Sequence, residues 1–399
     1  MNSWPTKKLG EVTERLRLEK APLGSWPYIE IGDVDLENKS VILKDKKSIK
    51  GAVIAPKDSV LISRVRPTRG AIALIDKNYI VSSAFTVLKA RQLETSSRFL
   101  FYWLGNLRKF YVYLQSKQKG SNYPSVREKD ILNYEIPLPP LKIQKQIVER
   151  LDKIVEAQKL NDKLIQKADE LSQSLLHKEL NPAGKDWEVK NIGEVCKIVG
   201  GGTPSREDLK HFKGDIPWVT VKDLHILEIE DTIEHINKES LKNSAANLVP
   251  ADTILVATRV GLGKIAIAKK PLTFNQDIKG LVANDGVDAS YLFYAILKNA
   301  GEIVKNGKGA TVKGVTQEFL KSIKILLPSL KTQKQIVEKL SAAQDYKTKL
   351  FAQRTKLKEL FDSVLHKSMY GEYEKSKFTP LDTKLSNGAQ RPHEKARRF

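Results

Sequence analysis

"LKIQKQIVER" at Leu141–Arg150 occurs again as "LKTQKQIVEK" at Leu330–Lys339, with eight of ten positions identical. Each copy opens a segment rich in Lys, Glu, Gln, Leu and Ala that continues without Gly or Pro to about residue 180 or 370. Proline stands just before each segment, at Pro140 and Pro328, where a helix can begin. The sequence therefore predicts two long helices, each about 60 Å in length.

Hydrophobic residues recur in heptads along both segments, as in a coiled coil. The first seam contains Ile147, Ile154, Asn161, Ala168 and Leu175 in one helix and Ile336, Ala343, Leu350, Leu357 and Val364 in the other. The second seam contains Ala157, Leu164 and Leu171, with Tyr346 and Leu360. We expect the helices to pack against each other within the chain as an antiparallel coiled coil.

The regions before the two helices also resemble each other, so the chain is a duplication. Short β-branched runs separated by turn residues predict strands in both regions, and one helix is expected in each, near Ser97–Gln115 and Ser290–Lys305. The matching stretches are "SWPTKKLGEV" with "DWEVKNIGEV", "PYIEIGDV" with "PWVTVKDL", "PKDSVLIS" with "PADTILVA", and "IPLPPL" with "ILLPSL".

The predicted fold class is α+β, with two β-rich domains separated by two long helices that form an intramolecular antiparallel coiled coil with pseudo-two-fold symmetry. The predicted parts are a first domain at 1–138, a helix at 139–182, a second domain at 183–327, a helix at 328–372, and a basic tail at 373–399.

Charge gives the first indication of function. The 68 Lys and Arg residues exceed the 47 Asp and Glu residues, for a net charge of +21. An excess of this size favours a polyanionic partner, nucleic acid first, over a merely basic protein without such a partner. The chain has no apolar run long enough for a membrane helix and no signal peptide at its start, so we expect a cytoplasmic protein without membrane contact. The single cysteine, Cys196, is expected to be a small buried hydrophobe.

Catalytic motifs are missing from the sequence. "GLGK" at Gly261–Lys264 lacks the spacing of a phosphate loop, and "GGGT" at Gly200–Thr203 lacks the G-x-G-x-x-G pattern of a dinucleotide site. The six histidines form no pair with metal-ligand spacing. We therefore predict a chain without catalytic residues, metal or cofactor of its own.

Basic and amide-rich loops are the candidates for DNA contact, because Arg suits guanine and phosphate while Asn and Gln suit adenine. Taken singly, each loop is also consistent with a solvated surface, but similar loops recur at equivalent places in both halves. In the first half the candidates are Arg64, Arg66, Arg69, Lys117, Lys119, Ser121, Asn122 and Tyr123. In the second half they are Thr203, Ser205, Arg206, Arg259, Lys264, Asn275, Gln276, Lys308, Thr311 and Lys313.

Together, the two W-x-x-x-x-[L/I]-G-E-V openings, the "GGTPS" loop before "GDIPWV", the proline exits and the two "QKQIVE" helices resemble the specificity subunit of type I DNA restriction-modification systems. The resemblance covers residues 1 to about 372, although "GGTPS" has no close counterpart in the first half. It implies two target-recognition domains, each reading one half of a bipartite site on double-stranded DNA, with the helices setting the spacing. It also implies that two methyltransferase subunits, and in some complexes restriction subunits, join the chain. S-adenosylmethionine, ATP and Mg would be bound by those partners.

The repeated helix starts are expected to present one docking surface twice, once for each methyltransferase subunit. A role confined to starting the helix is the alternative. The docking residues are Lys142, Gln144, Lys145, Gln146 and Glu149 in the first helix and Lys331, Gln333, Lys334, Gln335 and Glu338 in the second. The competing functions are a self-contained modification enzyme and a stand-alone architectural or regulatory DNA-binding protein.

Overall fold

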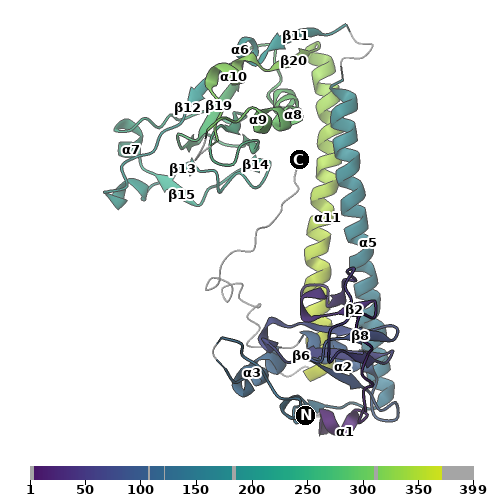
Figure 1. Cartoon of the computed structure of the whole chain (residues 1–399). Helices are drawn as coiled ribbons and strands as arrows, with labels where there is room; N and C mark the ends of the chain where they lie inside the picture. The colour runs from purple at the N-terminus through teal and green to yellow at the C-terminus, as the bar shows by residue number, and fades with distance from the viewer. Residues whose placement is uncertain (1–3, 107, 121, 182–185, 310–312, 371–399) are drawn as a thin grey trace. The chain divides into compact units, whose positions relative to one another are not determined.

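The computed structural model describes residues 4–106, 108–120, 122–181, 186–309 and 313–370. The chain forms two compact units (Figure 1). Unit 1 contains residues 1–162 and the last part of the second long helix from residue 353, and unit 2 contains residues 163–352. Each long helix therefore contributes to both units.

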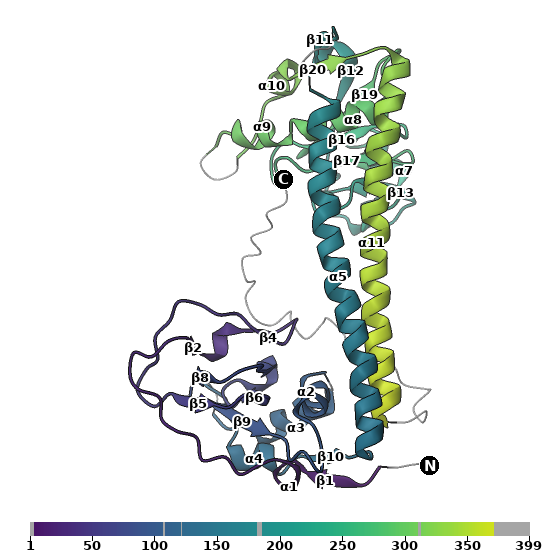
Figure 2. The same ribbon diagram turned by 90° about the vertical axis from the view of Figure 1, so that its right-hand side faces the viewer.

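The long helices predicted from the repeat are present as α5, Leu141–Glu179, and α11, Leu330–Tyr370. In unit 1 the Gln158 side chain donates to the Leu357 carbonyl at 3.3 Å, and the Arg354 Nε lies 3.1 Å from the Asp162 Oδ1. A later residue of α5 thus meets an earlier residue of α11, so the two helices are antiparallel in this unit (Figure 2).

The same order holds in unit 2. Lys347 pairs with Asp169, and the Lys339 Nζ lies 3.1 Å from the Glu179 Oε2. The predicted antiparallel packing is therefore confirmed within each unit.

The first seam is largely buried, with Ile147, Asn161 and Ala168 on α5 and Ile336 and Leu350 on α11 among its covered residues. The prediction of the second seam was wrong at three of its five residues, whereas Ala157 and Leu164 are partly buried. Leu171, Tyr346 and Leu360 are 51, 48 and 48% exposed. Two helices in contact cover only a narrow stripe of each other, so the flanking positions of each helix face away from its partner.

Unit 1 contains two three-stranded sheets, ordered β7-β6-β9 and β2-β8-β5, and two small antiparallel pairs, β3-β4 and β1-β10. The strands are β1 Thr6–Lys8, β2 Tyr28–Ile29, β3 Val34–Asp35, β4 Ser40–Val41, β5 Val53–Ala55, β6 Ser59–Ser63, β7 Ile72–Leu74, β8 Tyr79–Val81, β9 Phe85–Lys89 and β10 Glu135–Pro137. The helices are α1 Leu9–Val12, α2 Ser97–Asn106, α3 Arg108–Lys117 and α4 Glu128–Leu132, with short 3₁₀ turns η1 at Ile31–Asp33 and η2 at Pro67–Arg69.

Unit 2 contains a five-stranded sheet ordered β12-β19-β16-β17-β14, a three-stranded sheet β15-β13-β18, and the pair β11-β20. The strands are β11 Glu188–Asn191, β12 Cys196–Gly200, β13 Ile216–Val219, β14 Glu228–Ile229, β15 Glu234–Ile236, β16 Ile254–Ala257, β17 Ile265–Ala268, β18 Thr273–Phe274, β19 Ile278–Ala283 and β20 Lys324–Leu327. The helices are α6 Ile192–Val195, α7 Lys238–Lys242, α8 Ala289–Lys298, α9 Ala300–Lys305 and α10 Gln317–Ser322, with a 3₁₀ turn η3 at Leu209–Phe212.

In unit 2 the single expected helix is two helices. The break falls at Asn299, whose backbone leaves the helical region at φ −90° and ψ 5°, and α9 starts directly afterwards. In unit 1, α2 and α3 lie on either side of residue 107, which is outside the described residues. Periodicity alone does not reveal such a break, because the apolar spacing continues across it.

The helices α2 and α8 link the sheets to the long helices. In unit 1, Phe99 and Trp103 of α2 belong to the same core cluster as Ile62 of β6 and Ile147 of α5. The Arg98 Nε lies 2.7 Å from the Asp152 Oδ1 of α5. In unit 2, Leu292 of α8 shares a core with Ile254, Ile336 and Leu340. Each sheet is thereby fixed to the start of a long helix.

Candidate nucleic-acid interface

Three loops of unit 1 meet at one end of its sheets. In the β6–β7 loop, Arg64 O accepts a hydrogen bond from Val126 N at 2.9 Å, and Arg66 N donates to Pro124 O at 2.7 Å. Arg64 N donates to Ala84 O at 2.9 Å, which adds the β8–β9 loop. The two segments predicted as DNA-binding, 63–70 and 117–125, thus form one surface.

Arg66 and Tyr123 occupy the centre of this surface. The Arg66 guanidinium lies 5.2 Å from the centroid of the Tyr123 ring, a cation–π distance. Tyr123 is 73% exposed, and Arg69, Lys117, Lys119 and Asn122 are exposed as well. This end of unit 1 therefore presents several cations and an aromatic ring to solvent. Ser121 lies outside the described residues.

Two basic residues of unit 1 differ from expectation. Arg64 is only partly exposed; its side chain donates to the Ser83 carbonyl, and its Nε is buried without a hydrogen-bond partner among the described residues. Arg64 therefore holds the β8–β9 loop in place. Lys39 is an addition that no sequence motif indicates; its Nζ donates to Gly70 O at 2.9 Å and lies 5.8 Å from the Tyr111 ring. Burial lowers the pKa of Lys39.

Unit 2 repeats this loop arrangement with different side chains. Val315 N donates to Thr258 O at 2.9 Å, and Thr258 N donates to Asp277 O at 2.8 Å. Val315, Thr258 and Asp277 occupy the places that Val126, Arg64 and Ala84 occupy in unit 1. Arg259 Nε lies 3.7 Å from Asp277 Oδ1. The loops after β16, β18 and α9 are therefore brought together.

The other predicted residues of unit 2 lie around this junction or on the neighbouring "GGTPS" loop. The Lys264 Nζ donates to Val221 O at 3.2 Å, and the Asn275 Nδ2 lies 3.4 Å from the Asp277 Oδ2. Thr203 donates to Gln276, which joins the "GGTPS" loop to the β18–β19 loop. Ser205, Lys308 and Lys313 are exposed, and Thr311 lies outside the described residues.

Arg206 is an exposed residue whose guanidinium is ion-paired and stacked. Its two terminal nitrogens lie 3.0 Å from the two carboxylate oxygens of Glu234, and its guanidinium lies over Phe212 and Trp218 at 4.6 and 5.4 Å. The Glu234 hydrogen bond raises the pKa of Arg206 further. The ion pair and the two rings orient the Arg206 side chain beside the "GGTPS" loop, and because this side chain is 55% exposed, its assignment as a DNA contact stays a prediction.

The glycines of "GGGT" are required by close packing. A Cβ on Gly201 would lie 2.1 Å from Asn275 O, and one on Gly202 would lie 2.2 Å from the Ala245 carbonyl carbon. Only glycine fits at such approaches. These glycines therefore let the loop pack closely against the segments around Asn275 and Ala245.

The repeated glutamines at the helix starts are internal anchors. The Gln144 amide oxygen accepts from Thr95 Oγ1 at 2.8 Å, and its Nε2 donates to Glu94 O and Pro139 O. The Gln333 oxygen accepts from Asp288 N at 2.8 Å, and its Nε2 donates to Gly286 O and Pro328 O.

Both glutamines are only 1% exposed, so their prediction as docking residues was wrong. An amide that makes three hydrogen bonds inside the protein has no donor or acceptor atom to offer a partner. Glutamine recurs at these two positions because the same hydrogen-bonding pattern occurs in both units. It fixes the start of α2 to the start of α5 in unit 1, and the start of α8 to the start of α11 in unit 2.

The remaining residues of the repeat form one exposed stripe on each long helix. They lie three, four and seven residues apart, which places them on a single helical face. Lys142, Lys145, Gln146 and Glu149 make up stripe 1, and Lys331, Lys334, Gln335 and Glu338 make up stripe 2.

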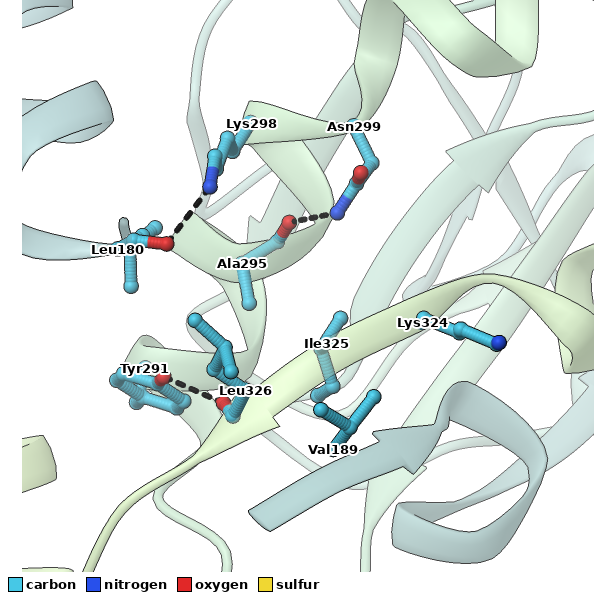
Figure 3. Close-up of a pocket in the computed structure, with 9 residues that line it drawn as sticks. All are labelled: Leu180, Val189, Tyr291, Ala295, Lys298, Asn299, Lys324, Ile325 and Leu326. Atoms are coloured by element: carbon cyan, nitrogen blue, oxygen red, sulfur yellow. Dashed lines mark hydrogen bonds between the residues drawn. The ribbon is translucent and has the colours of Figure 1, made fainter. Parts of the chain in front are cut away.

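A small pocket of about 230 Å³ lies in unit 2 between the end of α5, α8 and β20 (Figure 3). Lys298 Nζ donates to Leu180 O at 2.7 Å, and Tyr291 OH donates to Leu326 O at 2.6 Å. Burial raises the pKa of the Tyr291 hydroxyl. These polar groups are used in capping the end of α5 and anchoring β20, so the pocket is structural.

The residues that the structure describes contain no cluster of His, Cys, Asp and Glu arranged to hold a metal ion. No helix among them has an apolar stretch long enough to cross a membrane. Cys196 is buried as predicted, and burial raises the pKa of its thiol to about 12.

Comparison with known proteins agrees with a chain built of two similar parts. The protein-family model for the type I restriction modification DNA specificity domain matches residues 1–170 and 184–359. The chain therefore belongs to this family of DNA specificity domains, which is non-catalytic.

Named relatives carry the same description. The chain is 27% identical over 344 residues to the type I restriction enzyme EcoR124I/EcoR124II specificity subunit of Escherichia coli, covering 83% of this chain and 84% of that protein. It is 33% identical over 198 residues to the MjaIX specificity subunit of Methanocaldococcus jannaschii, a match that covers 48% of this chain and only 45% of that protein.

A solved structure from work on complex assembly and conformational transition of the type I restriction-modification system has a similar fold. It superposes with a TM-score of 0.65 at 21% identity, covering 93% of this chain and 98% of that one. This likeness supports the predicted fold of two β-rich regions and long helices.

Proposed function

We propose that this chain is the DNA-reading subunit of a type I restriction-modification complex, with unit 1 and unit 2 each reading one half of a bipartite target. The observation that carries the proposal is the repeated three-loop junction, in which backbone hydrogen bonds are kept while the exposed side chains differ. A conserved scaffold with different contact residues suits two different short DNA sequences. The antiparallel α5 and α11 would set the spacing between the two half-sites.

Stripe 1 and stripe 2 support a second part of the proposal. Each consists of two lysines, a glutamine and a glutamate at the same positions of a helix start, and all eight side chains are exposed. No packing requirement inside the described protein accounts for their identity. We infer that each stripe docks one methyltransferase subunit, so that two equal partners serve two unequal half-sites.

The chemistry would then belong to the partners. Double-stranded DNA and the methyltransferase subunits contact this chain, and restriction subunits join the complex where cleavage occurs. S-adenosylmethionine would be bound by the methyltransferase subunits, and ATP and Mg by the restriction subunits. No finding favours a self-contained enzyme or a stand-alone regulatory protein.

Co-expression of the chain with its methyltransferase subunit tests the proposal. The wild-type chain is expected to co-purify with two copies of the methyltransferase and to direct adenine methylation to a two-part sequence. Lys145→Glu and Lys334→Glu reverse one charge in each stripe, and each is expected to weaken docking of one copy by roughly tenfold, about 1.4 kcal/mol.

Lys163→Glu and Lys356→Glu are matched controls, because they place the same charge change on exposed positions of α5 and α11 outside the stripes. They are expected to leave docking intact. A wild-type chain that co-purifies with no methyltransferase subunit would contradict the proposal, and equal losses from stripe and control variants would contradict the docking surface.

A further inference from the structure

Arg66 differs from the other arginines of the candidate interface in how firmly it is held. Its backbone adopts the left-handed conformation, with φ 47° and ψ 52°, which is unfavourable for a residue with a long side chain. The backbone N–H donates to Pro124 O at 2.7 Å, and the following Pro67 is buried and fixes the next turn. The main chain at Arg66 therefore has a single defined direction.

The side chain of Arg66 is also oriented. Its guanidinium lies 5.2 Å from the centroid of the Tyr123 ring, and the segments carrying the two residues are joined by a bridge between Val65 and Ser125. Arg66 is partly exposed and Tyr123 is 73% exposed, so the stacked pair can be reached from solvent. In the described part of the chain, no carboxylate lies within ion-pair distance of Arg66.

The other arginines at the two interfaces lack this combination. Arg64 donates to Ser83 O, Arg206 is ion-paired with Glu234, and Arg259 lies 3.7 Å from an Asp277 oxygen. Arg69 is exposed on η2 without a stacked ring among the described residues. Arg66 alone among them combines a fixed backbone, a stacked planar group and an unneutralised charge.

Phosphate and base contacts make different demands on an arginine. A phosphate can be bound by a mobile cation, because its charge attracts from many directions. Base recognition requires a planar fork held at the correct angle, because two parallel N–H donors must meet two acceptors on a base edge. Guanine offers that pair as O6 and N7 in the major groove, whereas adenine replaces one acceptor with an amino group.

We propose that Arg66, oriented by Tyr123, reads a guanine in the half-site bound by unit 1. This inference rests on the proposed function and assigns one base of the target to one side chain. Arg69, Lys117 and Lys119 surround the pair and contact phosphates.

Genome-wide adenine methylation by the assembled complex, mapped by long-read sequencing, tests the assignment. The wild-type complex is expected to require a guanine at one position of one half-site. Arg66→Ala and Arg66→Lys are expected to reduce the preference at that position by roughly ten- to a hundredfold while the rest of the motif stays the same. Tyr123→Ala is expected to weaken the same position to a smaller extent, since the guanidinium remains but is no longer oriented.

Arg66→Gly separates recognition from folding. Glycine adopts positive φ freely, so this variant keeps the turn while removing the guanidinium, and it is expected to lose the same guanine. Arg69→Ala is the matched phosphate control; it should lower binding to all sequences evenly and reduce the salt dependence of affinity by about one charge. Lys77 lies away from these loops, with its Nζ 5.3 Å from the centroid of the Tyr79 ring. Lys77→Ala therefore removes a stacked cation outside the interface and should change neither the guanine preference nor the salt dependence.

The failures of the two proposals are distinguishable. A wild-type complex that methylates no two-part sequence would overturn the proposed function. A normal wild-type motif in which no position responds to Arg66→Gly, with methylation falling evenly at all sites, would overturn only the guanine assignment and place Arg66 on a phosphate.

Discussion

Unit 1 and unit 2 share a scaffold and differ in what it presents. Both units close with an antiparallel pair, β1-β10 or β11-β20, and both anchor the start of a long helix with a buried glutamine. Both units join their loops by an equivalent backbone hydrogen bond of 2.9 Å, from Val126 N to Arg64 O in unit 1 and from Val315 N to Thr258 O in unit 2. The bonds that repeat are between backbone atoms or buried side chains, so they constrain the fold without constraining the surface.

The differences between the units lie at the loops. Unit 2 has the strand β12 and the "GGTPS" loop with its Arg206–Glu234 ion pair, where unit 1 has only the isolated bridge between Thr13 and Ala90. Unit 1 has the Arg66–Tyr123 stack, where the position matching Arg66 in unit 2 is Val260. The two units therefore share one fold and differ in the residues exposed on their loops.

The largest effect on stability is expected from removing the repeated anchors. Gln144→Ala and Gln333→Ala each delete three hydrogen bonds of a buried amide and leave partners unsatisfied, at a cost of about 2–4 kcal/mol. Hydrogen exchange is expected to increase in α2 of unit 1 for Gln144→Ala and in α8 of unit 2 for Gln333→Ala.

The exposed neighbours provide the control. Gln146→Ala and Gln335→Ala change the same side chain on the solvent face and should alter stability by no more than about 0.5 kcal/mol. Equal effects from the buried and exposed glutamines would show that the shared anchor does not stabilise the helix starts.

A smaller expected effect is the pH dependence of stability at Asp33 in unit 1, which differs from that at the matched aspartate of unit 2. Burial raises the pKa of Asp33, but hydrogen bonds from Lys44, the Glu30 N–H and Lys46 outweigh burial and hold the pKa below its ordinary 3.8. The ionised carboxylate therefore stabilises unit 1 above the unfolded pKa, and this contribution is lost as pH falls through the folded pKa. Asp33→Asn should cost about 1–3 kcal/mol near neutral pH, and the difference from wild type should shrink in acid.

Asp223 is the matched position in unit 2. Its carboxylate accepts from Thr220 and from the Ile233 N–H, without a lysine contact among the described residues. Because neutral donors give weaker bonds than ammonium groups, Asp223→Asn should cost less. Unfolding measured from about pH 3 to pH 7 checks both variants, and a constant loss at Asp33→Asn over that range would contradict the ionic account.

The fold was predictable where the sequence repeats or is periodic. Two copies of one decapeptide led to the long helices, because seven-residue spacing and the absence of Gly and Pro are local signals. Their antiparallel packing was preferred over a parallel one because each helix follows one of two duplicated domains. The helix break at Asn299 was not predictable, since apolar spacing runs through it. The second seam failed because a heptad pattern does not state how much of each helix its partner covers.

The candidate site was predictable in its loops and only partly in its residues. Composition identified the segments around Arg66 and Tyr123, and the structure joins them. It did not show that Gln144 and Gln333 point inward, because a polar side chain is assigned to the surface unless its partners are known. Nor did it show that Glu234, 28 residues from Arg206 in the chain, would pair with that guanidinium.

The central claim is that two units on one scaffold read two different half-sites. It is tested most directly by mapping methylated adenines in cells that carry the complex with Arg66→Ala in unit 1 or Arg259→Ala in unit 2. The account predicts a two-part motif in which each variant changes a different part and leaves the other part intact. A single continuous motif, or both parts changing together in either variant, would contradict it.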